Sequence, residues 1–225
     1  MVHLSYLPNL AAAEPRLSGL STARLAQELA LARDLEADYL AIHPGHGELG
    51  PESFDRVARA LKQAVSEVPP PPLVLLENTA GQGRELGWRM SHLGKIITRS
   101  GVDLGLCLDT AHAFAAGYDL ATPAGAARLL AAIASGPGLH RLKIIHLNDS
   151  KAPLGSRRDR HMHLGLGTIG LNGLRQFLAH PWLSCEAAIM ETPQRHQADE
   201  WRNLLTARSL RSGPLLLASP SSEGG

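Results

Sequence analysis

Five short apolar segments of this chain end in a residue that can bind a metal ion or take part in acid–base chemistry. These residues are His43, Glu77, Asp109, His146 and Glu191. One such residue alone is usually a hydrogen-bonded polar group that faces a loop. Five of them in corresponding positions indicate a shared site, where clustered carboxylates would repel one another and take up protons unless a cation were bound. Mixed imidazole and carboxylate ligands favour zinc or manganese over magnesium or calcium.

Two further segments contain residues of the same chemical types. Asp109 and His112 are three residues apart at a strand-to-helix turn, and Asp159 and His161 occupy alternate positions of a loop that can direct both side chains the same way. The same loop carries Arg157, Arg158 and Arg160. A charged run is often only a solvated loop, but guanidinium groups match phosphate oxygens, so we interpret these arginines as the best local phosphate contacts.

A site with several metal ions is typical of phosphate ester hydrolysis, because one ion activates water while its neighbours neutralise the phosphate and stabilise the leaving oxygen. From the residues alone, a metal-dependent sugar isomerase or epimerase on the same kind of barrel stays open as an alternative. That reaction would need a lysine or sugar-positioning carboxylates at the strand ends. Lys143 and Lys151 are the lysines near them.

Apolar runs and helical patterns alternate along the chain. We expect strands over 39–42, 73–76, 104–108, 142–145 and 187–190, and helices over 22–36, 51–68, 87–98, 123–134, 172–178 and 199–209. Ser21 is the expected cap of the first helix. We expect one domain over 1–210 and a disordered tail over 211–225, which is rich in Ser, Pro and Gly near its end.

Strands that are apolar throughout and alternate with amphipathic helices predict a parallel sheet covered by helices on its outer face. In a TIM-type (β/α) barrel the carboxyl ends of the strands meet on one face, which agrees with a ligand-type residue at every strand end. An open doubly wound sheet would place a ligand at a single switch point instead. No glycine-rich phosphate loop follows the first strand. We therefore predict an α/β fold of the barrel type.

The overall composition excludes a protein that coats nucleic acid through its bulk charge. The formal net charge is +1, so any DNA contact must come from local basic patches. We expect the two cysteines, Cys107 and Cys185, to be reduced thiols, with Cys107 buried. The sequence shows neither a membrane-spanning stretch nor a signal peptide, so we expect a cytoplasmic protein.

Five motifs closely resemble endonuclease IV, a family of zinc-dependent abasic-site endonucleases built on a TIM barrel. They are HPG at 43–45, LENTAGQG at 76–83, CLDTAHAFAAGYD at 107–119, HLNDSKAPLGSRRDRHMHLGLGTIG at 146–170 and MET at 190–192. The resemblance runs in order from His3 to about Leu205. The motif with the arginines is the most specific of the five.

The resemblance implies three zinc ions, with Mn²⁺ as an alternative at one of the sites. His3 and His43 would hold one ion, and Glu77 would bridge it to a second. Asp109, His146 and Glu191 would complete the second site, and His112, Asp159 and His161 would hold the third. Six histidines lie outside this set, of which His163 is near enough to the third site to contact a ligand: His46, His92, His140, His163, His180 and His196.

The same resemblance implies a substrate and a reaction. The protein would act, as a monomer, on double-stranded DNA that contains abasic sites. Activated water would attack the phosphate 5′ to the lesion, with Glu77, Glu191 and Asp109 as the catalytic carboxylates, and 3′-blocking groups would also be removed. Arg157, Arg158 and Arg160 would bind DNA. Tyr6 would enter the gap left by the flipped-out abasic nucleotide.

The chain departs from the family pattern at its start. Family members carry about two more βα units before the segment that corresponds to His3, so we expect an incomplete barrel. A start codon assigned too far downstream, a fragment and an inactive remnant are all consistent with this departure. A second difference is Leu4, where the family usually has an acidic residue that could orient the first histidine.

Overall fold

The computed structural model describes residues 1–211, except 6 and 195. A six-stranded parallel sheet runs through it in the order β1-β2-β3-β4-β5-β8. These strands are β1 (Val2–His3), β2 (Tyr39–Ile42), β3 (Leu73–Glu77), β4 (Gly105–Asp109), β5 (Leu142–His146) and β8 (Ala187–Ile189). The chain therefore forms part of a TIM barrel, whose complete form has eight strands.

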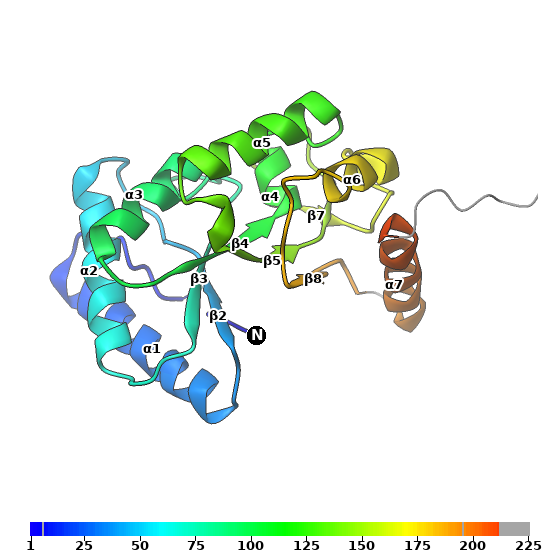
Figure 1. Cartoon of the computed structure of the whole chain (residues 1–225). Helices are drawn as coiled ribbons and strands as arrows, with labels where there is room; N and C mark the ends of the chain where they lie inside the picture. The colour runs from blue at the N-terminus through cyan, green and yellow to red at the C-terminus, as the bar shows by residue number, and fades with distance from the viewer. Residues whose placement is uncertain (6, 195, 212–225) are drawn as a thin grey trace, which may run out of the picture.

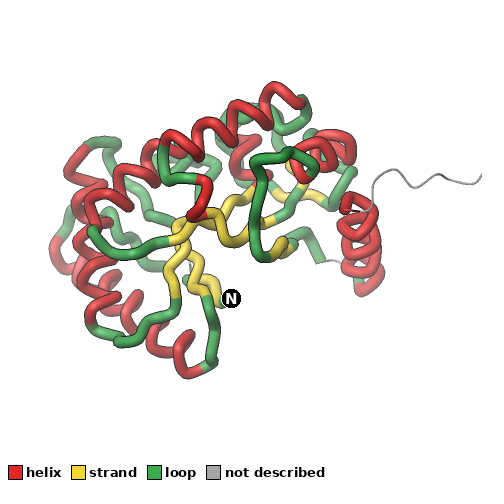
Figure 2. Tube along the Cα trace, viewed as in Figure 1, coloured by secondary structure: helices red, strands yellow, loops and turns green. Residues whose placement is uncertain are grey.

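The helices alternate with the strands and line the outer side of the curved sheet (Figures 1 and 2). The longer ones are α1 (Pro15–Asp34), α2 (Pro51–Ser66), α3 (Met90–Ser100), α5 (Pro123–Ser135), α6 (Gly170–Leu178) and α7 (Gln197–Arg211). Two short ones are α4 (Thr110–Ala115), which follows β4 directly, and the 3₁₀ helix η1 (Leu139–Arg141). No helix of the described residues is long and apolar enough to cross a membrane.

Alternate residues of the strands face two different layers. Leu40 and Ile42 of β2 belong to the large core between the sheet and the helices, together with Leu76, Leu106 and Ile145. The residues between them face the inside of the curved sheet, where Ala41, Leu75, Cys107 and Ile144 form a small buried cluster. Burial of Cys107 is confirmed, and both cysteines are free.

The pairing of the strands brings their carboxyl ends to one level. Asp109 pairs with His146, and His146 pairs with Ile189, two residues before Glu191. On the other side of Asp109, Glu77 pairs with Cys107 of β4. Because parallel strands carry their carboxyl ends on the same edge, the polar residues that end them are neighbours.

A buried carboxylate fixes the segment after β5. There the short antiparallel pair β6 (Asp149–Ser150) and β7 (His161–Met162) encloses the arginine-rich loop. The Asp149 carboxylate accepts hydrogen bonds of 2.8–3.4 Å from backbone N–H groups of Ser150, Gly165, Gly167, Ile169 and Gly170. A Cβ at Gly167 would lie 2.5 Å from Asp149 Oδ1, so this approach needs glycine. The loop that carries Asp159 and His161 is thus anchored at both of its ends.

The sequence analysis predicted the positions of the longer helices and strands well, but it predicted some of their ends less accurately. The strand over 39–42 is confirmed to the residue, whereas the first helix begins at Pro15 and not at Thr22. Glu14 caps it by accepting hydrogen bonds from the N–H groups of Arg16 and Leu17, so Ser21 is not the cap. Ser21 accepts a hydrogen bond from the N–H of Asn9 instead. The tail predicted over 211–225 lies outside the described residues, apart from Arg211.

Two helical glycines provide a matched test of packing. A Cβ on Gly94 of α3 would lie 2.7 Å from the carbonyl carbon of Gly136, whereas one on Gly19 of α1 would have open space. We predict that Gly94→Ala lowers the free energy of unfolding by about 1–3 kcal/mol through overpacking. Gly19→Ala should raise it by about 0.5–1 kcal/mol because alanine loses less backbone entropy in a helix. Urea unfolding of both variants checks this, and equal effects would contradict the close approach of α3 to Gly136.

Candidate metal centre

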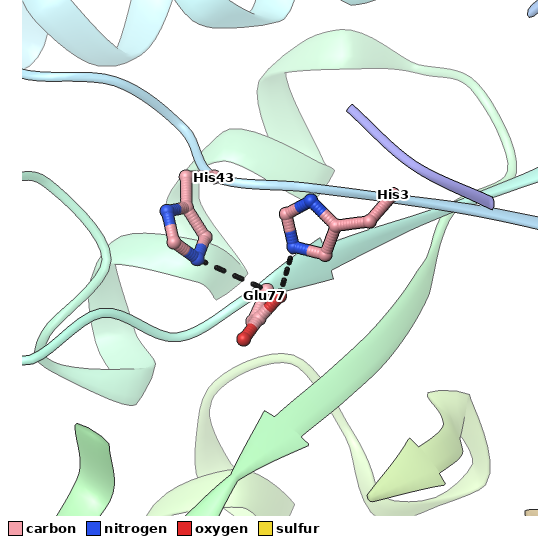
Figure 3. A group of neighbouring side chains, drawn as sticks. All are labelled: His3, His43 and Glu77. Carbon is pink, nitrogen blue, oxygen red and sulfur yellow. Dashed lines mark hydrogen bonds and ion pairs between the residues drawn. The ribbon is translucent and has the colours of Figure 1, made fainter. Parts of the chain in front are cut away.

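The carboxylate of Glu77 lies at the centre of the site and is fully buried. Its Oε2 is 2.7 Å from His3 Nε2 and 3.5 Å from His43 Nε2, and both imidazoles point towards it (Figure 3). Its Oε1 is 3.0 Å from His146 Nδ1. Burial by itself raises the pKa of Glu77, but hydrogen bonds from His146, His3 and His43 hold that pKa well below its usual value. His3, His43 and Glu77 form the first ligand group.

A second group shares Glu77 with the first. It consists of Glu77, Asp109, His146 and Glu191, whose ligand atoms lie within 4.8 Å of one another. His146 Nδ1 is 3.0 Å from Glu77 and 3.2 Å from Glu191 Oε2, so this imidazole lies between two carboxylates. Burial raises the pKa of Glu191, but the hydrogen bond to His146 brings it below its usual value. Glu77, Asp109 and His146 are the last residues of β3, β4 and β5, and Glu191 follows β8.

The third group shares Asp109 with the second and adds His112 and His161. The Nε2 atoms of the two histidines face each other at 3.3 Å. Asp159 Oδ1 is 3.3 Å from His112 Nε2 and 3.4 Å from His161 Nε2. Asp109 Oδ2 is also 3.4 Å from His161 Nε2. All nine residues that the sequence placed in a metal site are therefore brought together at one edge of the sheet.

Three of these histidines are oriented by backbone carbonyl groups. The acceptors of the Nδ1 atoms of His3, His112 and His161 are the carbonyl oxygens of Leu4, Asn78 and Glu191, at 2.8, 2.9 and 3.0 Å. A carbonyl oxygen can only accept, so each Nδ1 donates its proton and each Nε2 is directed into the site. This is the usual arrangement of histidines that bind metals. The backbone carbonyl of Leu4 therefore orients His3, although the acidic side chain that the family usually has at this position is absent.

The pKa values of two histidines are raised by the carboxylates around them, which favour positive charge in the site. Burial lowers the pKa of His112, but Asp109, Asp159 and Glu77 outweigh it and raise this pKa to about 10. The pKa of His146 is also raised, against the effect of burial, by its hydrogen bonds to Cys107, Glu191 and Glu77. Without a metal ion, protons on these imidazoles therefore balance the carboxylates at neutral pH. Five imidazoles and four carboxylates are donors that suit zinc, so the residues fit that ion.

Three polar residues that the sequence analysis did not single out hold the candidate ligand residues in place. Asn78 binds the backbone of Asp109 through both ends of its side-chain amide, at 3.0 and 2.8 Å. Asn148 donates to Asp109 Oδ2 and accepts from the N–H of Glu191. Thr110 Oγ1 bonds to the backbone of Asn148. Each of them directly follows a ligand residue or lies two residues after one, which is the signal that could have identified them.

An open groove of about 730 Å³ lies beside the third group. It is lined by the 81–83 turn, by Lys151 and by all three arginines of the loop: Arg157, Arg158 and Arg160. The guanidinium of Arg157 stacks at 3.9 Å on the ring of Trp88, and Arg89 lies 4.4 Å from that ring. Gln82 Oε1 accepts from the N–H of Asp159 at 3.3 Å, which connects the groove to a candidate ligand.

Two other residues that the sequence analysis placed at or near the site are Tyr6 and His163. Tyr6 lies outside the described residues. His163, which we expected near the third site, pairs through its Nδ1 with Asn203 Nδ2 of α7 at 2.9 Å. His163 therefore contributes to the attachment of the last helix.

Comparison with known proteins agrees with this geometry. Residues 1–211 match the xylose isomerase-like TIM barrel family. Over 217 residues the chain is 42% identical to the probable endonuclease 4 of Methanosphaerula palustris, covering 93% of this chain and 76% of that protein. The structure of endonuclease IV from Thermus thermophilus superposes with a TM-score of 0.80 at 39% identity, covering 93% of this chain and 74% of that one.

A more distant likeness shows the fold alone. A D-tagatose 3-epimerase-like protein superposes with a TM-score of 0.70 at 20% identity, covering 93% of this chain and 76% of that one. Its lower identity contrasts with the close match to the endonucleases, which extends over almost all of the described sequence. The chain belongs to the endonuclease IV family of the xylose isomerase-like TIM barrels.

Proposed function

We propose that this protein is a DNA repair endonuclease that cleaves the phosphodiester 5′ to abasic sites in duplex DNA and removes 3′-blocking groups, with three zinc ions. One observation carries the proposal: three ligand groups meet at the strand ends of an endonuclease IV family member. The arginine groove beside them supplies a surface for phosphates. Incision of a duplex that contains one synthetic abasic site, with and without a chelator, tests the proposal.

The lysines do not favour a sugar isomerase. Lys143 is the second residue of β5, three residues before His146, and its Nζ pairs with Glu186 at 3.1 Å. Lys151 lines the arginine groove. Neither is among the residues that meet at the strand ends.

We assign three ligand sets to the zinc ions. These are His3, His43 and Glu77 for the first; Glu77, Asp109, His146 and Glu191 for the second; and His112, Asp159 and His161 for the third. When bound, zinc would supply an activated water at neutral pH and positive charge against the phosphate. Glu77 and Asp109 are fully buried, whereas the side chain of Glu191 is 37% exposed. We therefore assign Glu191 as the carboxylate that accepts the proton of the attacking water.

The chain's own arginines bind and orient the substrate in this proposal. Arg158 and Arg160 are exposed, and their guanidinium groups can bind two phosphate oxygens each. Arg157 is held against Trp88, so it presents its N–H edge without further ordering. Phosphate contacts of this kind fix the position of the DNA but do not read its sequence.

Replacement of the central carboxylate should abolish activity. Glu77→Gln keeps the shape of the side chain but removes the charge proposed to join two ions. Loss of a group that merely orients a ligand costs about 10–100-fold, so we expect the incision rate to fall by more than about 100-fold. The control is Glu186→Gln at an exposed glutamate that pairs with Tyr39 and Lys143, which should leave the rate unchanged. A Glu77→Gln protein with the wild-type incision rate would refute the assignment.

Zinc binding should release protons from the metal-free protein. The pKa of His112 is raised to about 10 in the folded protein. The stability that its protonated form contributes is therefore complete below about pH 6.5 and is lost as the pH rises through about 10. A metal ligand must be neutral, so zinc must displace protons from His112 and His146, about two in total near pH 7.5. Calorimetry in buffers of different ionisation enthalpy measures them. His112→Asn should release about one proton fewer, while His140→Asn, at an exposed histidine of η1, should match the wild type.

The arginines of the groove should set the salt dependence of DNA binding. We expect Arg158→Ala and Arg160→Ala each to weaken binding to an abasic duplex and to reduce the slope of log affinity against log salt by about one. Arg33→Ala removes an exposed arginine that pairs with Asp34 at the end of α1, and it should leave the slope unchanged. Fluorescence anisotropy at several salt concentrations measures the slopes. Equal slopes for all four proteins would exclude the loop arginines as phosphate contacts.

A further inference from the structure

Asn148 joins two of the proposed ligand residues through a single side-chain amide. It lies between β5 and β6 and is fully buried. Its Nδ2 donates to Asp109 Oδ2 at 2.7 Å, and its Oδ1 accepts from the N–H of Glu191 at 2.8 Å. The two partners leave no choice of amide orientation, because an N–H must meet the oxygen and a carboxylate must meet the nitrogen.

Asp109 is the carboxylate that the second and third ligand groups share. Its Oδ1 accepts from the N–H of His112 at 2.7 Å, and its Oδ2 accepts from Asn148. The same Oδ2 is 3.4 Å from His161 Nε2 in the third group. Donors on both oxygens therefore fix the rotation of the carboxylate. Asn148 supplies the donor on the oxygen that faces the third group.

Glu191 is the other residue that Asn148 positions. It follows β8, the last strand of the sheet, and its side chain is partly exposed. The hydrogen bond from its backbone to Asn148 ties the end of β8 to β4 and β5, and its carbonyl also accepts from His161 Nδ1. Asn148 is itself held by Thr110, whose Oγ1 is 2.6 Å from its carbonyl oxygen and 2.9 Å from its backbone nitrogen.

We infer that Asn148 is a positioning residue that controls the occupancy of the second and third metal sites but not of the first. His3, His43 and Glu77, which make up the first group, have no hydrogen bond to Asn148 among those found in the described residues. The inference rests on the proposed function, because it assumes that the three groups bind zinc. Loss of the amide then frees Asp109 and Glu191 together. Both belong to the set proposed for the second ion, and the backbone carbonyl of Glu191 orients His161 of the set proposed for the third.

The test is a zinc titration of Asn148→Leu, which keeps the number and branching of the side-chain heavy atoms but removes both hydrogen bonds, and of Asn148→Ala. Zinc content after dialysis and competition with a chromogenic chelator give the stoichiometry and the affinity of each ion. We expect three tightly held ions in the wild type and one in each variant, with the affinities of the other two reduced by about 10–100-fold. Circular dichroism checks that each variant folds. If the Asn148→Leu protein does not fold, the titration of the Asn148→Ala protein is the test.

The control is Leu129→Ala, which opens a cavity in the buried side of α5. It should lower stability and keep all three ions, which separates positioning from general destabilisation. Three ions of unchanged affinity in the Asn148 variants would overturn the role of Asn148 while leaving the zinc centre intact. Weakening of all three ions to the same extent would also overturn it. A wild-type protein that holds no zinc would instead refute the proposed function.

Discussion

The fold at the strand ends depends on how the buried charge of Glu77 is balanced. An unpaired carboxylate in a protein interior costs on the order of several kcal/mol. Here the carboxylate meets imidazoles of His3, His43 and His146, which come from β1, the end of β2 and β5. This balance is achieved only if those strands end at the same level. The charge of one residue therefore constrains the register of the sheet, the tautomers of the histidines and the need for cations.

The same constraint explains why the rest of the edge is so polar and yet well ordered. Carboxylates and imidazoles brought this close would rearrange if their backbones were free to move. The amides of Asn78 and Asn148 and the hydroxyl of Thr110 connect the ends of neighbouring strands by hydrogen bonds. Amide and hydroxyl groups of this kind do not titrate. Asp149 holds the following loop through backbone N–H groups alone. Asn78 and Thr110 thus hold the backbone of the candidate ligand residues by hydrogen bonds that do not change with the protonation of those residues.

Much of this arrangement could be predicted from the sequence because it is local. Apolar runs that end in His, Asp or Glu identified the strands and the edge where they meet, and β2 was placed to the residue. The ligand set came from the motifs of the family. The start of α1 was missed because Glu14 is an uncommon capping residue and Pro15 fits the first turn without an N–H to satisfy. The stacking of Arg157 on Trp88 joins residues far apart in sequence, and no periodic pattern records such a contact.

That stacking has a consequence for how an anion can reach the loop. A guanidinium whose face lies on an indole ring has lost access from that side, and the backbone of Arg157 is in the left-handed region, with φ 53°. The N–H groups of a guanidinium point outward along the rim of its plane, so an anion that it binds approaches in that plane. In the proposed function, Arg157 would therefore set the direction from which a phosphate approaches, and the fluorescence of the Trp88 indole would report its arrival.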